Sequence, residues 1–253
     1  MSKVLIGTSG WVYKDWAGIF YPGDLPQNKW LEYYSQNFKT VEVNSTFYHQ
    51  MKPETFAKWR QKVAKDFIFS VKANRFITHI KRLLECGEPL KRLLEQVKDL
   101  GNNSGPILFQ LPPALKANEN RLKSFINKLR TTNGGKASLL RSAEVKTCFE
   151  FRDKSWFQDK VFNILRKYNV ATVINDSPHF PKVEEITGDF TYIRFHGPSA
   201  LYSSEYSNRE LKVWTSKIKK WLKNKIDVYC YFNNDVGGFA IKNATTLIQM
   251  LEA

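Results

Sequence analysis

Polar and charged side chains recur at the ends of short apolar runs, in pairs with one residue between the two members. Four pairs show this spacing: Glu42 with Asn44, Lys72 with Asn74, Glu150 with Arg152, and Arg194 with His196. Single polar residues end or follow three further runs: Gln110, Asp176 and Asn233. Side chains alternate between the two faces of a strand, so both members of each pair point to the same side. The pattern predicts one shared polar site.

The residue types in this set favour binding of a small anion. The guanidinium forks of Arg152 and Arg194 match a carboxylate or a phosphate group. Hydrogen bonds to the same ligand are expected from the remaining polar members of the set: Asn44, Asn74, Gln110, Asp176 and Asn233. The predicted ligand is therefore a small phosphorylated or carboxylated molecule.

The same set contains the groups needed for proton transfer. Glu42 or Glu150 would act as the general base. Lys72 or His196 would be its proton partner. Charged groups are costly to bury without partners, and here the formal charges balance. Three cations face three anions: Lys72, Arg152 and Arg194 against Glu42, Glu150 and Asp176.

The elements that would position these residues alternate along the chain. Short apolar runs predict strands at residues 4–6, 40–43, 67–71, 107–109, 148–151, 170–174, 192–195 and 228–232. Apolar residues at helical spacing predict helices at about 30–38, 54–63, 83–100, 122–129, 161–168, 211–222 and 239–251, while residues 175–187 are expected to be irregular. Strands alternating with helices indicate parallel βαβ units.

Eight strands with this spacing over 253 residues predict a single α/β domain, a TIM-like (βα)8 barrel spanning residues 1–253. The alternative is a doubly wound open sheet, which typically has a glycine-rich phosphate loop after its first strand. The sequence there is Gly7-Thr8-Ser9-Gly10-Trp11, which lacks the GxGxxG spacing. Barrel enzymes carry their active sites at the carboxyl ends of the strands, where the polar set is predicted to lie.

The charge of the chain permits a nucleic-acid partner. With 39 Lys+Arg against 24 Asp+Glu, the formal net charge is 39 − 24 = +15, and basic chains attract phosphate backbones. Aromatic residues crowd the loop after the first strand, namely Trp11, Tyr13, Trp16, Phe20 and Tyr21. Such rings could stack bases, or they could pack as a lid over the barrel. We expect most of the excess charge to be a solvated surface of lysines.

Metal and cysteine chemistry are less favoured. Glu42, Glu150, Asp176 and His196 could hold a hard divalent ion, with His49 or His79 joining, but no HExxH motif or paired histidine spacing occurs. We therefore assign no metal ligands, and the sequence does not identify a cofactor. The three cysteines, Cys86, Cys148 and Cys230, are far apart, which excludes a disulfide framework. Without a signal peptide or an apolar span, a cytoplasmic protein is expected.

Three hypotheses follow for the function. The leading one is an enzyme of unknown reaction class that acts on a small anionic ligand by acid/base chemistry. The second is a nucleic-acid-binding protein or nuclease. The third is a non-catalytic structural or interaction module, which requires that the charges at the strand ends satisfy one another and leave no open pocket.

The ordered motifs at the strand ends resemble the YecE-like family, catalogued as domain of unknown function seventy-two. They include Val41-Glu42-Val43-Asn44-Ser45-Thr46-Phe47-Tyr48, Gln110-Leu111-Pro112-Pro113, Glu150-Phe151-Arg152, Arg194-Phe195-His196-Gly197 and Phe232-Asn233-Asn234-Asp235. The resemblance covers nearly the whole chain and implies a TIM-barrel-like fold. Asp153 departs from the family, which more often has His after the Arg. The family has no settled activity, so the resemblance implies no catalytic residue.

Overall fold

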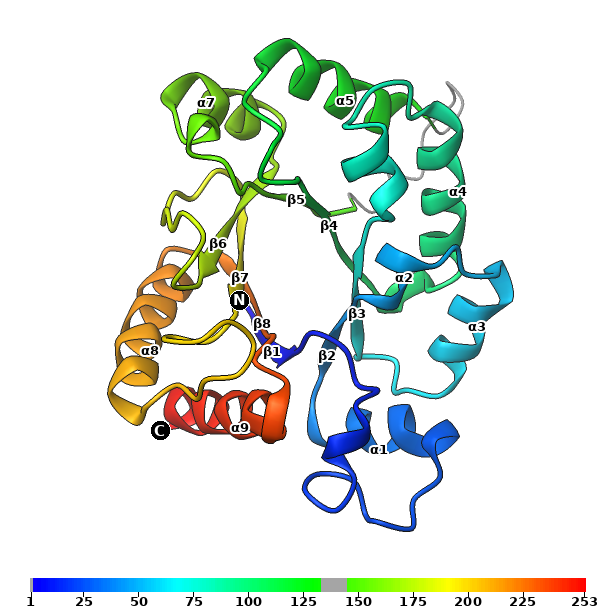
Figure 1. Ribbon diagram of the computed structural model, residues 1–253, viewed down its shortest axis with the longest axis vertical. Coiled ribbons are helices and arrows are strands. Elements are labelled where there is room, and N and C mark those ends of the chain that lie inside the picture. Colours follow the sequence, from blue (N-terminus) through cyan, green and yellow to red (C-terminus); the bar gives the residue numbers. More distant parts are fainter. Residues whose placement is uncertain (1, 133–144) are drawn as a thin grey trace.

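Eight parallel strands form a nearly closed barrel in the computed structural model, which describes residues 2–132 and 145–253 (Figure 1). The hydrogen-bonded order is β1-β8-β7-β6-β5-β4-β3-β2, with every neighbouring pair parallel. The strands are β1 (Val4–Thr8), β2 (Thr40–Val43), β3 (Ile68–Lys72), β4 (Ser104–Gln110), β5 (Thr147–Glu150), β6 (Ala171–Asp176), β7 (Phe190–Phe195) and β8 (Asp227–Phe232). The predicted α/β class and TIM-like (βα)8 barrel are confirmed.

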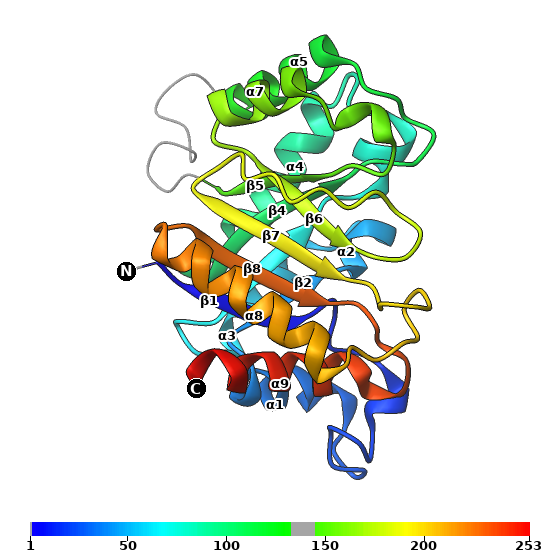
Figure 2. The ribbon, with the colours of Figure 1, turned by 90° about the vertical axis from the view of Figure 1, so that its left-hand side faces the viewer.

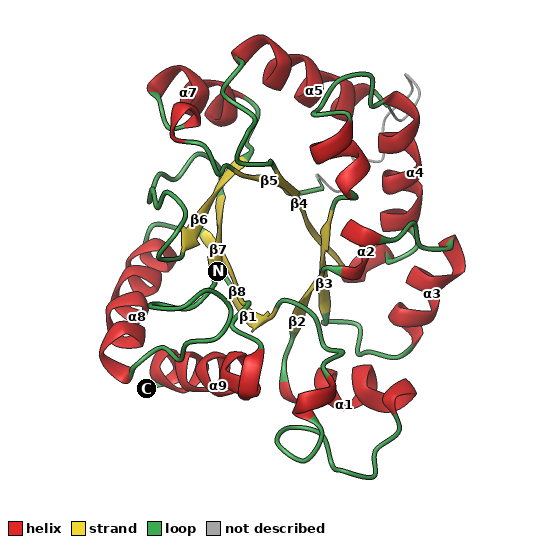
Figure 3. Ribbon diagram, in the orientation of Figure 1, coloured by secondary structure: helices red, strands yellow, loops and turns green. Residues whose placement is uncertain are grey.

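The helices surround the ring of strands (Figure 3). They are α1 (Trp30–Asn37), α2 (Ser45–Tyr48), α3 (Pro53–Gln61), α4 (Gly87–Lys98), α5 (Glu119–Thr131), α7 (Asp159–Lys167), α8 (Asn208–Lys223) and α9 (Phe239–Glu252). Residues 177–189, between β6 and β7, form no helix, as the sequence predicts. Within the described residues, no helix is both long and apolar enough to cross a membrane.

Two local features differ from the predicted elements. The helix expected from residue 83 begins at Gly87, because Leu83 and Glu85 adopt a left-handed backbone with φ of 70° and 48°. The short helix α2 and a π-helical turn at Phe76–Ile80 follow β2 and β3 directly, and the hydrophobic pattern does not predict them. Both insertions lie at the carboxyl ends of strands.

The seam between β1 and β2 closes the barrel without a continuous hydrogen-bonded ladder. One bridge joins Ser9 to Glu42. The hydroxyl of Tyr34, from α1, accepts the Thr8 N–H at 2.9 Å and donates to the Thr40 carbonyl at 3.0 Å. A Cβ at Gly7 would lie 2.1 Å from that carbonyl oxygen, so the two strands can approach this closely only with glycine at position 7. The seam sets the distance between Ser9 and Glu42.

Alternation along the strands divides the core in two. Outward-facing residues, including Val43, Phe151 and Phe195, are at most 1% exposed and pack beneath the helices. Inward-facing residues fill the barrel itself, and their apolar members are Leu108, Cys148, Ala171, Val173, Phe190, Tyr192, Tyr229 and Tyr231. The side view in Figure 2 shows the strands running together, so their carboxyl ends meet at one rim, which we call the mouth. The polar pairs therefore converge there.

Candidate functional site

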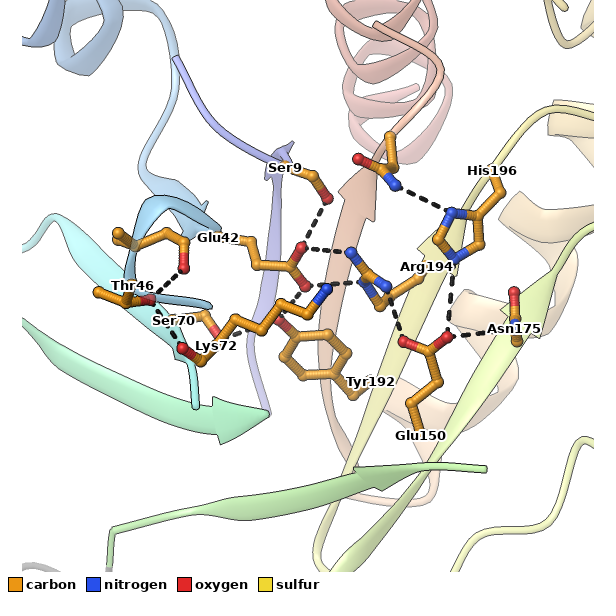
Figure 4. Close-up of polar contacts among 12 residues, drawn as sticks. Ser9, Glu42, Thr46, Ser70, Lys72, Glu150, Asn175, Tyr192, Arg194 and His196 are labelled. Atoms are coloured by element: carbon orange, nitrogen blue, oxygen red, sulfur yellow. Dashed lines mark hydrogen bonds and ion pairs between the residues drawn. The ribbon is translucent and has the colours of Figure 1, made fainter. Parts of the chain in front are cut away.

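A buried arginine joins two carboxylates at the centre of the mouth (Figure 4). Arg194, from β7, donates to both oxygens of Glu42: Nε at 2.9 Å and one terminal nitrogen at 2.8 Å. Its other terminal nitrogen donates to Glu150 at 2.6 Å. All three side chains are at most 1% exposed. These contacts offset much of the free-energy cost of removing the three charged groups from water.

Hydroxyl groups complete the surroundings of Glu42. Ser9, at the β1–β2 seam, donates to Oε1 at 2.7 Å, and Tyr192 donates to Oε2 at 2.7 Å. The Tyr192 hydroxyl also lies 2.8 Å from that of Ser70, one layer deeper in the barrel. Glu42 is thus fixed by Ser9, which follows β1, and by Tyr192 and Arg194 of β7.

Glu150 receives three further groups from its neighbours. The Nε of Arg152 donates to Oε1 at 2.7 Å, Asn175 donates to the same oxygen at 3.3 Å, and Nε2 of His196 lies 4.0 Å from it. Burial alone would raise the pKa of Glu150, but the guanidinium groups of Arg152 and Arg194 outweigh it and hold that pKa well below its usual range. Glu150 is therefore an anion at neutral pH.

Lys72 differs from the other cations of the mouth. It is 7% exposed, and its amine lies 4.1 Å from the centre of the Phe47 ring. Figure 4 shows its side chain extending from the end of β3 toward Arg194 and Glu42. Within the described part of the chain its amine forms no ion pair or hydrogen bond, whereas Arg152 and Arg194 are both paired. Burial, followed by the charge of Arg194, lowers the pKa of Lys72 to about 7.

Several buried polar atoms around the mouth have no hydrogen-bond partner among the described residues. They are Asn44 Oδ1, Asn175 Oδ1, His196 Nε2 and Asp235 Oδ1. Among the described residues the His196 ring forms one hydrogen bond, with Asn233, whose amide nitrogen lies 3.0 Å from Nδ1. Burial and the charge of Arg194 lower the pKa of His196 well below its usual value, so the ring is neutral. A neutral ring that accepts at Nδ1 carries its proton on Nε2, facing Glu150.

Asp235 adds a titratable carboxyl that the sequence analysis did not select. It follows β8, and burial raises its pKa to about 7. Tyr13 lies beside it, and burial together with the Asp235 charge raises the pKa of that phenol. The sequence feature that could have identified Asp235 is its position two residues after Asn233, the same spacing that relates the members of the four polar pairs.

The structure places most of the predicted set at the mouth, with two exceptions. The prediction that Asp176 faces the mouth is wrong: its carboxylate accepts from Trp214 of α8 and from Lys182, both at 2.9 Å, on the outer side of the sheet. Asn74 holds the loop after β3 instead, donating to the Thr46 carbonyl and accepting the Phe76 N–H, each at 2.9 Å. Gln110 is level with Glu150 in the β4–β5 register.

Asn175 occupies the place predicted for Asp176. Both end β6, and alternation allows only one of them to face inward. The register pairs Asn175 with Arg194, so the amide points into the mouth and the carboxylate points out. Because Asp176 points away from the mouth, the expected balance of three anions and three cations does not hold there. Among the described residues, Lys72 is the cation of the predicted set that has no ion-pair partner.

The aromatic side chains that could have stacked bases are packed against other side chains instead. Trp16 and Tyr21, from the loop after β1, are at most 1% exposed, and Tyr21 stacks on Trp30 with ring centres 4.6 Å apart. Phe180, in the connection between β6 and β7, lies 3.8 Å from the Arg152 guanidinium. Beside the mouth, α2, the π-helical turn and α4 line a separate surface pocket of about 460 Å³, to which Asn74 also contributes.

The four residues considered as metal ligands do not all share one site, although Glu42, Glu150 and His196 lie close together. Glu42 and Glu150 are both paired with Arg194, and Asp176 faces away from them. In residues 2–132 and 145–253, no group of three or more histidine, cysteine, aspartate or glutamate side chains is placed to hold a metal ion.

Comparison with known proteins gives consistent relatives over the whole chain. The UPF0759 protein YunF of Bacillus subtilis (strain 168) is 24% identical over 280 residues, covering 98% of this chain and 95% of that protein. The UPF0759 protein YecE of Escherichia coli (strain K12) is 25% identical over 245 residues, covering 86% of this chain and 82% of that protein. The crystal structure of a DUF72 family protein from Thermotoga maritima MSB8 matches with a TM-score of 0.83 and 29% identity, over 99% of this chain and 100% of that one.

The family model described as "Protein of unknown function DUF72" matches residues 5–253. The motifs at the strand ends that suggested this resemblance lie within that range. The chain belongs to the DUF72 family of proteins of unknown function.

Proposed function

We propose that this protein is an enzyme that binds a small anionic ligand at the barrel mouth and transfers protons there. The observation that carries the proposal is Lys72, a nearly buried residue whose amine forms no ion pair within the described residues. A buried cation is costly unless a negative charge accompanies it. An anionic ligand group would supply that charge.

Arg152 is the second group for the anion. Its Nε donates to Glu150, and within the described residues its two terminal nitrogens form no hydrogen bond. Its side chain is 8% exposed, beneath Phe180. A guanidinium with two terminal nitrogens available can bind a carboxylate or phosphate through parallel hydrogen bonds. Arg194, by contrast, is fully engaged with Glu42 and Glu150, so we assign it a positioning role.

The proton-transfer groups are those that can change charge near neutral pH or donate from a neutral ring. Lys72 and Asp235 both have pKa values of about 7, the range in which general acids and bases work best. His196 offers its Nε2 proton from a neutral imidazole. Glu42 and Glu150, held by Arg194, set the electrostatic environment for these groups instead of acting as bases.

The alternative of a purely structural module accounts for part of the mouth. The contacts of Arg194 with Glu42 and Glu150 are satisfied by one another, as that hypothesis requires. It gives no reason why, among the described residues, Lys72 forms no ion pair and Asn44 Oδ1 and His196 Nε2 have no hydrogen-bond partner. Nucleic-acid binding was suggested by the net charge and by aromatic rings that could stack bases. The rings of Trp16 and Tyr21 are buried, so they are not available for stacking, and the net charge is the remaining support.

Calorimetric titration with oxalate and with inorganic phosphate tests the proposal. We expect binding to the wild-type protein, and at least a tenfold weaker affinity for Arg152→Gln, because a charge-assisted hydrogen bond contributes about 1.5–3 kcal/mol. Arg166→Gln is the matched control, since Arg166 pairs with Glu185 on the surface. Absence of binding by both probes, or equal affinities of wild type and Arg152→Gln, would contradict the proposal.

A further inference from the structure

Two lysines of this chain lie against aromatic rings at opposite ends of the barrel. Lys72, at the carboxyl end of β3, is 4.1 Å from the centre of the Phe47 ring. Lys146, just before β5, is 4.8 Å from the centre of the Phe190 ring. Lys146 has two carboxylate partners, Asp189 at 3.4 Å and Asp227 at 3.2 Å. Lys72 forms no ion pair in the described part of the chain, and it is also less exposed, at 7% against 26% for the Lys146 side chain.

The neighbours of Lys72 also favour its neutral form. The guanidinium groups of Arg194 and Arg152 oppose a third positive charge, and burial acts in the same direction. Glu42 and Glu150 have the opposite effect, but both are already paired with arginine. A substantial fraction of Lys72 is therefore a free amine at neutral pH, when ordinary lysines are almost entirely protonated. A free amine is a nucleophile.

We propose that Lys72 is a covalent catalytic residue whose amine forms an imine with the carbonyl carbon of a small anionic aldehyde or ketone. This inference rests on the proposed function, since it names the substrate class and the chemistry of the same site. A desolvated lysine beside other cationic groups is the arrangement that activates an amine for this reaction. Arg152 would hold the carboxylate or phosphate of the substrate, directing its carbonyl toward Lys72.

The step balances without any further reagent. The amine nitrogen attacks the carbonyl carbon, and a carbon–nitrogen bond forms. The carbonyl oxygen then leaves as water, taking the two protons of the amine. The product is an imine between Lys72 and the substrate, and no group is oxidised or reduced.

Reductive trapping tests the inference on the full-length wild-type protein. Sodium cyanoborohydride at pH 7 reduces an imine to a stable secondary amine, with pyruvate in one experiment and glycolaldehyde phosphate in another. Peptide mass spectrometry then compares the modified fractions of Lys72 and Lys146. We expect Lys72 to be modified at least tenfold more than Lys146 with one of the probes, because the amine of Lys146 is held by Asp189 and Asp227 and that of Lys72 has no such partner in the described residues.

Lys72→Arg provides a second measurement, because arginine keeps the positive charge and forms no imine under these conditions. We expect its total incorporation of the reactive probe to fall to the level of surface lysines. If neither probe modifies Lys72 more than Lys146, or if Lys72→Arg incorporates as much as the wild type, the inference is wrong.

The two proposals fail in different ways. Oxalate and inorganic phosphate have no aldehyde or ketone group, so their binding tests the anion site alone. Binding of these probes without trapping at Lys72 would overturn the imine and leave the proposed anion site standing. Selective trapping at Lys72 without oxalate or phosphate binding would support the imine and remove the role assigned to Arg152.

Discussion

Arg194 determines whether the two buried carboxylates of the mouth can coexist. Glu42 and Glu150 are 0% exposed, and each is within 2.9 Å of this one guanidinium. Removing one partner of a buried ion pair leaves an uncompensated buried charge, which strongly lowers the free energy of unfolding. The complete pair, by contrast, contributes little net stability, because the cost of desolvation offsets the attraction between the charges. The residues at the centre are thus energetically coupled.

We expect Glu42→Gln to lower the free energy of unfolding by about 3–5 kcal/mol, because Arg194 keeps its charge and loses a bidentate partner. Urea unfolding followed by circular dichroism measures this. Glu184→Gln is the control: its partners Lys182 and Lys217 lie at the surface, and a change below about 1 kcal/mol is expected there. Equal effects of the two substitutions would contradict the account.

Lys72 makes stability depend on pH in a defined direction. Its pKa falls from 10.5 in the unfolded chain to about 7 in the folded one. Between these values the unfolded state binds more protons, so stability rises with pH from about 7 upward. Relative to Lys72→Met, the wild type should gain about 2–3 kcal/mol between pH 7 and pH 9. Urea unfolding of both proteins at several pH values measures the difference; a pH-independent difference would show that Lys72 titrates normally.

At this scale the sequence predicts residue types better than orientations. Alternation correctly pairs Glu150 with Arg152 and Arg194 with His196, because both members of each pair lie within or just after one strand. It fails at the end of β6, where Asn175 and Asp176 are adjacent and only the register with β7 decides which faces inward. Tyr192 lies two residues before Arg194 and therefore on the same face of the strand, but from the sequence it is indistinguishable from any aromatic residue of the core.

Among the elements, α1 contributes directly to closing the barrel. The Tyr34 hydroxyl replaces missing ladder bonds by contacting Thr8 on β1 and Thr40 on β2. The bridge between Ser9 and Glu42 lies just beyond it on the same seam. The helix therefore supports both the barrel and one carboxylate of the mouth.

Tyr34→Phe should destabilise the protein by about 1–3 kcal/mol, because it leaves the Thr8 N–H and the Thr40 carbonyl buried without a partner. Tyr33→Phe is the matched control on the same helix, since the Tyr33 ring packs against Phe20 and Tyr21. Thermal and urea unfolding measure stability, and amide exchange at Thr8 reports on the seam. An effect no larger than that of Tyr33→Phe would refute this role.

The sequence predicts these elements where hydrophobic periodicity is long, and misses them where it is short. All eight strands and the longer helices follow from it. The four-residue helix α2 and the π-helical turn at Phe76–Ile80 are shorter than the period needed to detect them. Both shape the rim of the mouth, so its covering could not be derived from the pattern.

At the scale of the whole molecule, the net charge of the chain does not determine the charge at the mouth. The chain carries a formal charge of +15, and the residues at the centre of the mouth are paired cations and anions. The cation without a counterpart in the described mouth is Lys72, beside Arg152. That local imbalance, rather than the overall charge, supports a small anionic ligand.

The central claim is that the mouth receives such an anion between Lys72 and Arg152. The most direct measurement is a crystal structure of the full-length protein, grown without phosphate or sulfate and then soaked in oxalate. The account predicts oxalate density in contact with the Lys72 amine and the Arg152 terminal nitrogens, with Phe180 displaced. A mouth that keeps Phe180 over Arg152 and contains no oxalate, at concentrations where the anion diffuses freely through the crystal, would contradict it.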